Sequence, residues 1–262
     1  METLIRLTAA LSIFGIMIFW EYLKPRRKLP VERLVRWPIN LGLAAINMLI
    51  MRLTVGSAAY LAAVDAEQNH WGLLNQFNLP DSFTIIMSLL FLDFAIYGQH
   101  VLSHKWSLLW RIHQVHHSDL AFDATTAIRF HPLEILISML YKVACIYLIG
   151  ADAFAVILFE IILNGAATFN HSNIAIPESV DKRLRFLIVT PDMHRIHHST
   201  IRTETDSNYG FSITCWDRLC GTYKAHPKYS QDQMFIGLDY YRDKKVLSFL
   251  DLCMMPFRAL PK

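Results

Sequence analysis

Residues 100–117 read HVLSHKWSLLWRIHQVHH and carry the strongest signal in the chain. The stretch contains an HxxxH array, from His100 to His104, and an HxxHH array, from His113 to His117. Residues three and four apart on a helix lie on the same face, so each array can aim imidazole rings at a common point. The spacing therefore predicts helices that each present a preformed set of metal ligands.

The C-terminal half of the chain repeats the second pattern. Residues 194–198 form another HxxHH array, and His171 lies upstream of it. Nine of the twelve histidines fall in or beside these clusters, whereas His70 and His226 are expected to be ordinary core or surface residues. Burying so many imidazoles without a ligand would leave each ring in need of hydrogen-bond partners. We therefore interpret the motif histidines as metal ligands: His100, His104, His113, His116, His117, His194, His197 and His198.

The number of histidines narrows the kind of metal site. Imidazole binds Zn, Cu, Fe and Ni, so the ligand type alone does not identify the metal. Eight motif histidines exceed what one tetrahedral zinc can use, and a catalytic zinc site normally has three protein ligands and an open position. The sequence has no HExxH motif and no GxSxG, Walker or GxGxxG signature. We therefore interpret the histidines as the shared ligands of two metals that perform redox chemistry.

The composition indicates a membrane protein. Hydrophobic residues make up 53% of the 262 residues, above the average of soluble proteins, and the mean hydropathy is +0.29. The net charge of +3 is too small to suggest a nucleic-acid surface. The four cysteines form no CxxC pair and are expected to be reduced thiols.

Four apolar stretches can form membrane helices, because about 20 residues of helix cross the hydrocarbon of a bilayer. The first three fit single spans, whereas the fourth is interrupted at residues 150–152 and can be a hairpin of two short helices or two complete spans. The first stretch continues into an aromatic and basic boundary, so a retained anchor is expected in place of a signal peptide. The stretches cover residues 4–22, 39–63, 83–101 and 134–164.

The distribution of basic residues predicts which side of the membrane the histidines face. Residues 24–36 contain six lysines and arginines, whereas residues 64–82 contain none. The positive-inside rule places the first loop, and with it all the histidine motifs, on the cytosolic side. Arg52 and Lys142 lie within apolar stretches, where we expect them to reach the interface or to pair with an acid rather than to act in catalysis.

The same residues resemble the fatty acid hydroxylase and sterol desaturase superfamily, whose hallmark is HxxxH, HxxHH and a later HxxHH on the cytosolic ends of membrane helices. The resemblance covers roughly residues 85–225. Blocks that are similar to the core of the family are residues 92–104, 109–118 and 125–134. Blocks that read like bacterial members of the sterol desaturase branch are residues 169–173, 190–199, 208–210 and 216–223.

The resemblance implies two irons held by the eight motif histidines, with His171 as a further ligand. It leaves His131 either as another ligand or as a residue beside the ligands or along the substrate entrance. Asp93 lies seven residues before His100 on the same helical face, where its carboxylate could accept the outer N–H of a ligating imidazole. The alternative for Asp93 is a hydrogen-bonded helix residue with no role at the metal.

The implied activity is that of a di-iron oxygenase, which uses O2 and external electrons to hydroxylate or desaturate a C–H bond of a sterol, fatty acyl chain or related lipid. The chain has no flavin, nicotinamide, haem or iron–sulfur signature. Electrons derived from NAD(P)H are therefore expected to arrive from a separate reductase, ferredoxin or cytochrome b5-like donor. Two alternatives stay open: an ether-lipid monooxygenase of the alkylglycerol type, and a non-catalytic membrane scaffold that binds metal.

The predicted fold is all-α: an integral membrane bundle of four or five helices with a helical cytosolic cap that holds a histidine-rich dimetal site. The expected domains are N-terminal transmembrane helices in residues 1–80, a catalytic domain in residues 81–225 and a C-terminal cytosolic tail in residues 226–262. The expected location is the bacterial inner membrane, with the metal site on the cytosolic face.

Overall fold

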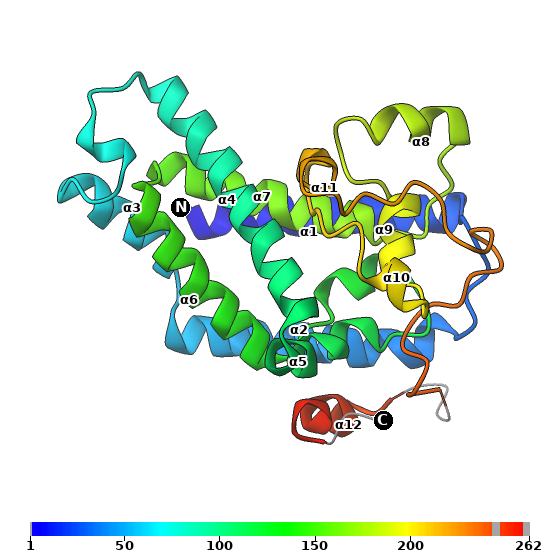
Figure 1. Cartoon of the computed structure of the whole chain (residues 1–262). Helices are drawn as coiled ribbons and strands as arrows, with labels where there is room; N and C mark the ends of the chain where they lie inside the picture. Colours follow the sequence, from blue (N-terminus) through cyan, green and yellow to red (C-terminus); the bar gives the residue numbers. More distant parts are fainter. Residues whose placement is uncertain (1, 243–246, 259–262) are drawn as a thin grey trace.

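The computed structural model describes residues 2–242 and 247–258, and over these residues the regular secondary structure is helical. Three isolated β-bridges join loop segments without forming a strand in this part of the chain. The predicted all-α fold is therefore confirmed. Long helices form a bundle, and shorter ones gather beside it (Figure 1).

Five segments of the described chain are long and apolar enough to cross a membrane. The apolar stretch at residues 134–164 forms two of them, so the two-span alternative matches the structure. A short turn at Gly56 separates α2 from α3, and the two helices count as one segment. The segments are α1 (Glu2–Leu23), α2 (Arg33–Thr54) with α3 (Ala58–Gln68), α4 (Asp81–Lys105), α6 (Pro132–Ile149) and α7 (Ala153–Asn170).

The turn between α6 and α7 follows from the residues that interrupt the apolar stretch. Gly150 ends α6 in the left-handed conformation at φ +71°, which favours glycine. Asp152 begins α7 by accepting a hydrogen bond from the backbone N–H of Ala155 at 2.7 Å. Gly72 packs so closely on this turn that a Cβ there would lie 2.0 Å from the Gly150 nitrogen. The close contact holds the turn against the loop that follows α3.

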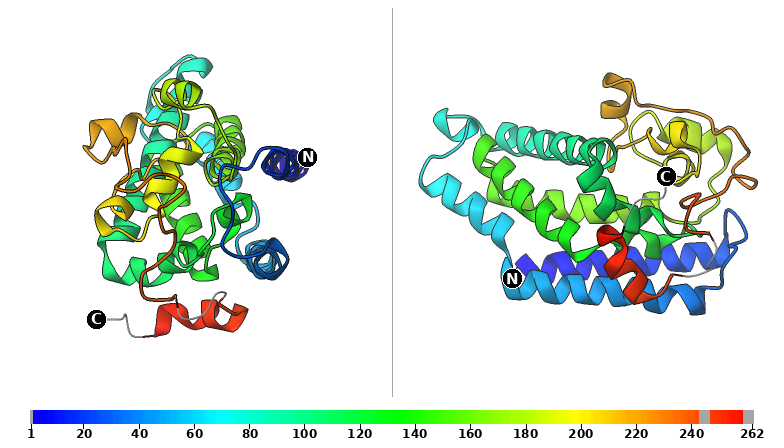
Figure 2. Two further views of the ribbon diagram at one scale, coloured as in Figure 1. Left: turned by 90° about the vertical axis from the view of Figure 1, so that its right-hand side faces the viewer. Right: turned by 60° about the horizontal axis from the view of Figure 1, so that its bottom comes forward.

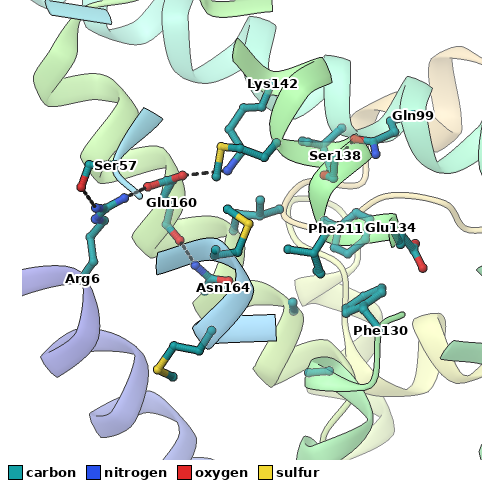
Figure 3. Close-up of a pocket in the computed structure, with 18 of the residues that line it drawn as sticks. Arg6, Ser57, Gln99, Phe130, Glu134, Ser138, Lys142, Glu160, Asn164 and Phe211 are labelled. Carbon is teal, nitrogen blue, oxygen red and sulfur yellow. Dashed lines mark hydrogen bonds and ion pairs between the residues drawn. The ribbon is translucent and has the colours of Figure 1, made fainter. Parts of the chain in front are cut away.

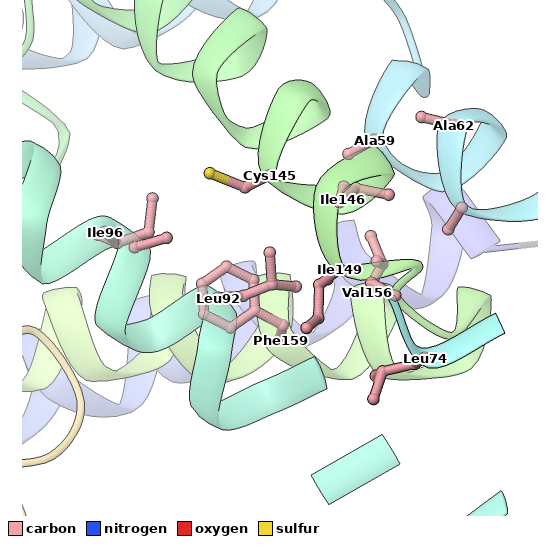
Figure 4. Close-up of a cluster of buried hydrophobic side chains, with 13 residues drawn as sticks. Ala59, Ala62, Leu74, Leu92, Ile96, Cys145, Ile146, Ile149, Val156 and Phe159 are labelled. Atoms are coloured by element: carbon pink, nitrogen blue, oxygen red, sulfur yellow. The ribbon is translucent and has the colours of Figure 1, made fainter. Parts of the chain in front are cut away.

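The largest cluster of buried apolar side chains lies between α3, α4, α6 and α7 (Figure 4). It includes Leu92 of α4, Ile146 of α6 and Phe159 of α7. The outer faces of the long helices carry exposed large apolar side chains, such as Leu11 and Phe19 of α1. An apolar outer surface on helices of this length suits a lipid environment, so the bundle is that of an integral membrane protein.

Shorter helices bring the histidine motifs together. α5 (Ser107–His117) leaves α4 after a sharp turn at Trp106, whose backbone is extended at φ −96° and ψ 116°. Four helices beyond α7 gather at the end of the bundle away from α3 (Figures 1 and 2). They are α8 (Glu178–Leu184), α9 (Pro191–His197), α10 (Arg202–Thr205) and α11 (Cys215–Leu219).

The remaining short elements connect or support the long helices. η1 (Leu74–Gln76) follows α3, and η2 (Ala124–Ile128) packs against α1, α2 and α7. α12 (Phe249–Met254) packs against α2, and η3 (Met255–Phe257) packs against α5. The segment that forms α12 and η3 thus packs on α2 and on α5, the helix that carries the first HxxHH array.

Candidate metal centre

One group of five histidines forms where α4, α5 and α9 meet. The ligand nitrogens of the group all lie within 4.8 Å of one another, and every ring is buried. α4 supplies the HxxxH pair, α5 supplies the first and last histidines of its HxxHH array, and α9 supplies one histidine. The members of this group, group one, are His100, His104, His113, His117 and His197.

A second group of four histidines lies directly beside the first. Its ligand nitrogens also lie within 4.8 Å of one another. The two groups touch through His117 and His198, whose rings stack with centroids 4.4 Å apart. The members of this group, group two, are His116, His171, His194 and His198.

Each HxxHH array contributes to both groups because of its helical spacing. His113 and His117 are four residues apart on α5 and enter group one together, whereas His116 points to group two. The array at the end of α9 divides the other way, since His194 and His198 enter group two and His197 enters group one. Each of the two sites therefore contains histidines from both HxxHH arrays. The spacing in the sequence was equally compatible with one array at each site.

The nitrogens of group one suit a metal ion. All five Nε2 atoms are buried and have no hydrogen-bond partner among the described residues. Three of the rings donate their outer Nδ1–H at 2.6–2.7 Å: His100 to the carbonyl of Tyr209, His197 to the carbonyl of Ser207, and His113 to the Glu134 carboxylate. Donation through Nδ1 leaves the inner Nε2 as a lone pair. Three such acceptors, together with the unpartnered Nε2 atoms of the other two rings, suit a bound cation, because leaving a buried polar atom unpaired costs about 1–3 kcal/mol.

Group two shows the same arrangement around His171. Its Nδ1 donates to the carbonyl of Ala167 at 2.7 Å, so its Nε2 carries no proton. That Nε2 lies 3.1 Å from Nε2 of His116 and 3.2 Å from Nε2 of His194. Both ring nitrogens of His198 are buried without a partner in the described part of the chain. The four rings therefore bring their ligand nitrogens close enough together to bind one metal ion.

Burial favours the neutral form of six imidazoles of this centre. It lowers the pKa of His116, His117, His194 and His198 well below the usual range, and nearby imidazoles add to the effect. Burial likewise lowers the pKa of His171 to about 4 and that of His197 to about 3. Neutral imidazole is the form that binds a metal, so no proton has to be displaced at neutral pH.

The loop at residues 208–210 positions the Tyr209 carbonyl, which accepts the outer N–H of His100. The carboxylate of Asp217 accepts hydrogen bonds from the backbone N–H groups of Tyr209, at 2.8 Å, and Gly210, at 2.9 Å. Asn208 adopts a left-handed φ of +53°, and its side-chain amide donates to the carbonyl of Met193 in α9 at 3.1 Å. These bonds explain why the block at residues 208–210 accompanies the histidine arrays.

A buried polar network supports the centre from the side of α2. The Arg36 guanidinium donates to Asp119 at 2.8 Å and to Asp123 at 2.9 Å. Arg129 donates to the Val115 carbonyl in α5 at 3.0 Å and to Asn40 of α2 at 2.7 Å. Burial raises the pKa of Asp119, but the two arginines outweigh burial and leave that pKa below its usual value. From the sequence, Arg36 was interpreted only as one of six basic residues at positions 24–36, and the network was not predicted.

The structure places Asp93 and His131 outside the two histidine groups, and Asp93 has the surroundings of the alternative given for it, a hydrogen-bonded helix residue. The Asp93 carboxylate accepts a hydrogen bond from the Trp216 indole at 2.8 Å, and the outer N–H of His100 goes to the Tyr209 carbonyl instead. His131 lies outside both histidine groups and caps α6, where its Nδ1 accepts from the backbone N–H of Leu133 at 3.1 Å. Among the described residues, neither Asp93 nor His131 forms a hydrogen bond or a ring contact with a histidine of the two groups.

Glu134 was not identified from the sequence, and it makes the contact that was one of the two alternatives for Asp93. Its carboxylate accepts the outer N–H of His113 at 2.6 Å. The sequence contained a signal for Glu134, because the residue lies in the block at residues 125–134 that resembles the family. In the structure it lies in the first turn of α6, whose N-cap is His131. Spacing alone did not link it to His113, since the two residues sit on different helices.

A cavity of about 920 Å³ begins at the metal centre and extends between the long helices. His100 lines it, together with Phe130 and Phe211. The Phe130 ring stacks on His116 with centroids 4.4 Å apart, and the Phe211 ring lies 4.9 Å from His100. The aromatic rings give the metal end of the cavity an apolar wall (Figure 3).

Comparison with known proteins finds similarity over the part of the chain that holds this centre. The model of the fatty acid hydroxylase family ("Fatty acid hydroxylase") matches residues 85–222, which include all nine histidines of the two groups. No solved structure matches the chain.

Three curated relatives illustrate the similarity. The ornithine lipid hydroxylase OlsE of Rhizobium tropici is 30% identical over 160 residues, which cover 60% of this chain and 46% of the relative. The alkylglycerol monooxygenase of Homo sapiens is 31% identical over 158 residues, covering 59% of this chain and 34% of the relative. The cholesterol 25-hydroxylase of Rattus norvegicus is 24% identical over 145 residues, covering 55% and 47%. The matched part of the chain thus spans less than half the length of these relatives.

Proposed function

The chain belongs to the fatty acid hydroxylase family, and from this premise we propose that it is a membrane-bound di-iron oxygenase that hydroxylates or desaturates a C–H bond of a lipid. One observation carries the proposal: two adjacent groups of buried histidines bring their ligand nitrogens within 4.8 Å of one another in each group, at the end of a large cavity. Relatives named as hydroxylases of ornithine lipid and cholesterol support a lipid substrate.

We propose that the nine histidines hold two irons, with the five histidines of group one at one iron and the four of group two at the other. Bound iron would supply O2 activation and the removal of hydrogen, using electrons from outside the chain. The chain's own residues orient the rings: the carbonyls of Tyr209 and Ser207 and the carboxylate of Glu134 each hold one imidazole from behind. Phe130 and Phe211 keep water from the metal end of the cavity.

The proposed setting is the bacterial inner membrane, with the centre on the cytosolic face. Its support is the basic loop at residues 24–36, which follows the first span at the same end of the bundle as the histidine groups. The proposed domains are the N-terminal membrane helices of residues 1–80, the catalytic domain of residues 81–225 and a C-terminal tail from residue 226 to residue 262. The proposed electron donor is a separate reductase, ferredoxin or cytochrome b5-like protein that draws on NAD(P)H.

Cleavage of an ether lipid is a second candidate function. Alkylglycerol monooxygenases from several animals match this chain, at 31% identity in Homo sapiens and 30% in Xenopus tropicalis. Hydroxylation beside an ether oxygen would use the same centre and differ only in the substrate. Incubation of the enzyme with matched ether and ester lipids, followed by mass spectrometry of the products, separates the two candidates.

The first test is the metal content of protein purified in detergent under anaerobic conditions. Two irons per chain, with spectra that change on reduction and exposure to O2, are expected for the oxygenase. Stable zinc alone, with no activity after exchange for iron, would contradict the proposal and favour a metal-binding scaffold.

A further inference from the structure

The cavity has two chemically different ends. Aromatic residues and His100 line the metal end, as described above, whereas Arg6 and Ser57 lie at the other end (Figure 3). Apolar side chains such as Ile96, Met139 and Leu163 line the space in between. A cavity whose lining is mostly apolar between its ends and charged at one end suits an amphiphile with a single chain.

The distance between the metal end and the charged end of the cavity follows from the rise of the helices that line it. Glu134, Ser138 and Lys142 follow one another at intervals of four residues on α6, and all three line the cavity. The eight residues from Glu134 at the metal end to Lys142 correspond to about 12 Å of helix rise. On α7, the eleven residues from Glu160 to His171 correspond to about 16 Å. The charged end therefore lies about 12–16 Å from the metal centre.

Charged side chains at this end pair incompletely. The Lys142 ammonium donates to Glu160 at 2.7 Å, and Arg6 donates to the same carboxylate and to the Ser57 hydroxyl. Glu160 and Lys142 are only 6% and 9% exposed. The pairing of Lys142 with an acid was one of the two outcomes expected from the sequence. An ammonium has three donors, so Lys142 retains capacity for another acceptor.

Arg52 adds a positive charge that the pair does not use. It lies in the last turn of α2, lines the cavity and makes no ion pair with any residue in the described part of the chain. Three cationic side chains, Arg6, Arg52 and Lys142, thus line this end. Two carboxylates oppose them, Glu160 and Glu2, and Glu2 pairs with Arg6, so one positive charge is left without a partner among the described residues. Charged groups inside membrane segments are costly and mark binding sites more often than structural ones.

We propose that Arg52, Arg6 and Lys142 bind the anionic head of a single-chain lipid, whose alkyl chain extends through the cavity toward the metal centre. A carboxylate and a phosphate share the chemistry that these donors recognise. The part of the inference that concerns oxidation rests on the proposed function: the oxidised carbon is then remote from the head, at a distance set by the protein. One wall of the cavity is the face of α6 that carries Glu134, Ser138 and Lys142, and it spans the distance between the head of the lipid and the metal centre.

The test is ligand binding in phosphatidylcholine nanodiscs, without reductant, so that no turnover occurs. Dodecanoate, dodecyl phosphate and dodecanol are titrated by displacement of a fluorescent fatty acid, and empty discs correct for partitioning. We expect at least one of the two anions to bind about tenfold or more tightly than dodecanol, as for a charge-assisted hydrogen bond. The anion that binds more tightly identifies the source of the head. Equal affinity for all three probes would overturn the proposal.

Variants locate the subsite. Arg52→Gln should remove most of the preference for the anion, whereas Arg183→Gln, which changes an exposed arginine of α8, should leave it intact. Ser138→Phe should weaken binding of dodecanoate more than that of octanoate, because the added ring narrows the cavity halfway along α6. Anion preference that persists in Arg52→Gln, or a Ser138→Phe variant that treats both chain lengths alike, would refute the assignment.

The binding result and the proposed function can fail separately. Anion binding that responds to Arg52→Gln in a protein that holds only zinc would retain the head subsite and reject the oxygenase. Iron-dependent oxidation without any preference for an anion would retain the oxygenase and reject the subsite. In an active enzyme, product analysis should find oxidation toward the methyl end of the chain, and oxidation next to the head would contradict the proposed orientation.

Discussion

Most hydrogen bonds that orient the imidazoles of the metal centre are made to backbone carbonyls. The outer N–H groups of His100, His171 and His197 donate to main-chain carbonyls, which only accept and therefore fix the tautomer of each ring. His113 is the exception, because its partner is the carboxylate of Glu134. A side chain can be replaced without disturbing the backbone, so this contact is the one that mutation can test cleanly.

Glu134→Ala should weaken iron binding about 10- to 100-fold, the usual effect of removing the partner of a metal-bound histidine. The physical reason is the loss of the acceptor that holds the His113 ring, together with the loss of its negative charge. Iron affinity can be measured by equilibrium dialysis against a chelator of known affinity. Asp93→Asn is the matched control, because Asp93 bonds to Trp216 and should leave the affinity unchanged. Full iron affinity in Glu134→Ala would mean that Glu134 does not support the centre.

Single ligand replacements should empty the two groups separately. His197→Ala removes a nitrogen from group one, and His116→Ala removes one from group two, so each variant is expected to retain about one iron in place of two. His131→Ala should retain both irons, because His131 lies outside the groups. Elemental analysis of the purified variants measures this, with circular dichroism as the check on folding. Loss of iron in His131→Ala would reinstate it as a ligand.

At the scale of single elements, the direction of each helix decides which histidine serves which group. His113 and His117 are one turn apart and share a face of α5, whereas His116 is rotated away from that face. The spacing HxxHH is visible in the sequence, but it does not tell which member of the array meets which partner helix. That assignment depends on how α4, α7 and α9 pack around α5.

The turn between α6 and α7 should be sensitive to any side chain. Gly72→Ala places a methyl group 2.0 Å from the backbone of Gly150, at a φ of +92° that costs an L-residue about 1–2 kcal/mol even before the clash. We expect a clear fall in the unfolding temperature, measured by fluorescence in detergent. Gly15→Ala in α1 is the control, since nothing lies within 4 Å of its new methyl group. An unchanged unfolding temperature in Gly72→Ala would contradict the close packing of this turn.

At the scale of the whole molecule, the buried network of Arg36, Asp119 and Asp123 joins the start of α2 to the metal-bearing part of the chain. The residues are separated by more than 80 positions along the chain, yet their charges meet at hydrogen-bond distance. A basic residue that looked like a topology signal in the sequence is therefore also a structural link. The two roles are compatible, because the loop and the histidine groups lie at the same end of the bundle (Figure 1).

Arg36→Ala should destabilise the protein by about 3–5 kcal/mol, because it removes the buried arginine that pairs with both Asp119 and Asp123. The expected readouts are a lower unfolding temperature and a loss of bound iron, since Asp119 follows the first HxxHH array by two residues. Lys182→Ala, which removes an ion pair exposed on α8, should change neither quantity appreciably. Normal stability and iron content in Arg36→Ala would show that the network is dispensable.

Several features of this protein were determined by local sequence. Apolar stretches of sufficient length predicted the membrane helices, and the turn residues Gly150 and Asp152 separated the last two of them. The three arrays and His171 named in advance every histidine that the two groups contain. These predictions succeed because hydrophobic length and helical periodicity act between near neighbours in the chain.

Only the tertiary structure decided how the histidines divide between the groups, which atoms hold them and where the charged end of the cavity lies. Asp93 was matched to His100 by helical spacing, yet a main-chain carbonyl of Tyr209, more than 100 residues away, takes that bond. A backbone carbonyl exists at every position and leaves no residue-specific signal. Glu134 and His113, like Arg6 and Glu160, meet only after separate helices pack together. Such contacts depend on the packing of the whole bundle, which no local pattern encodes.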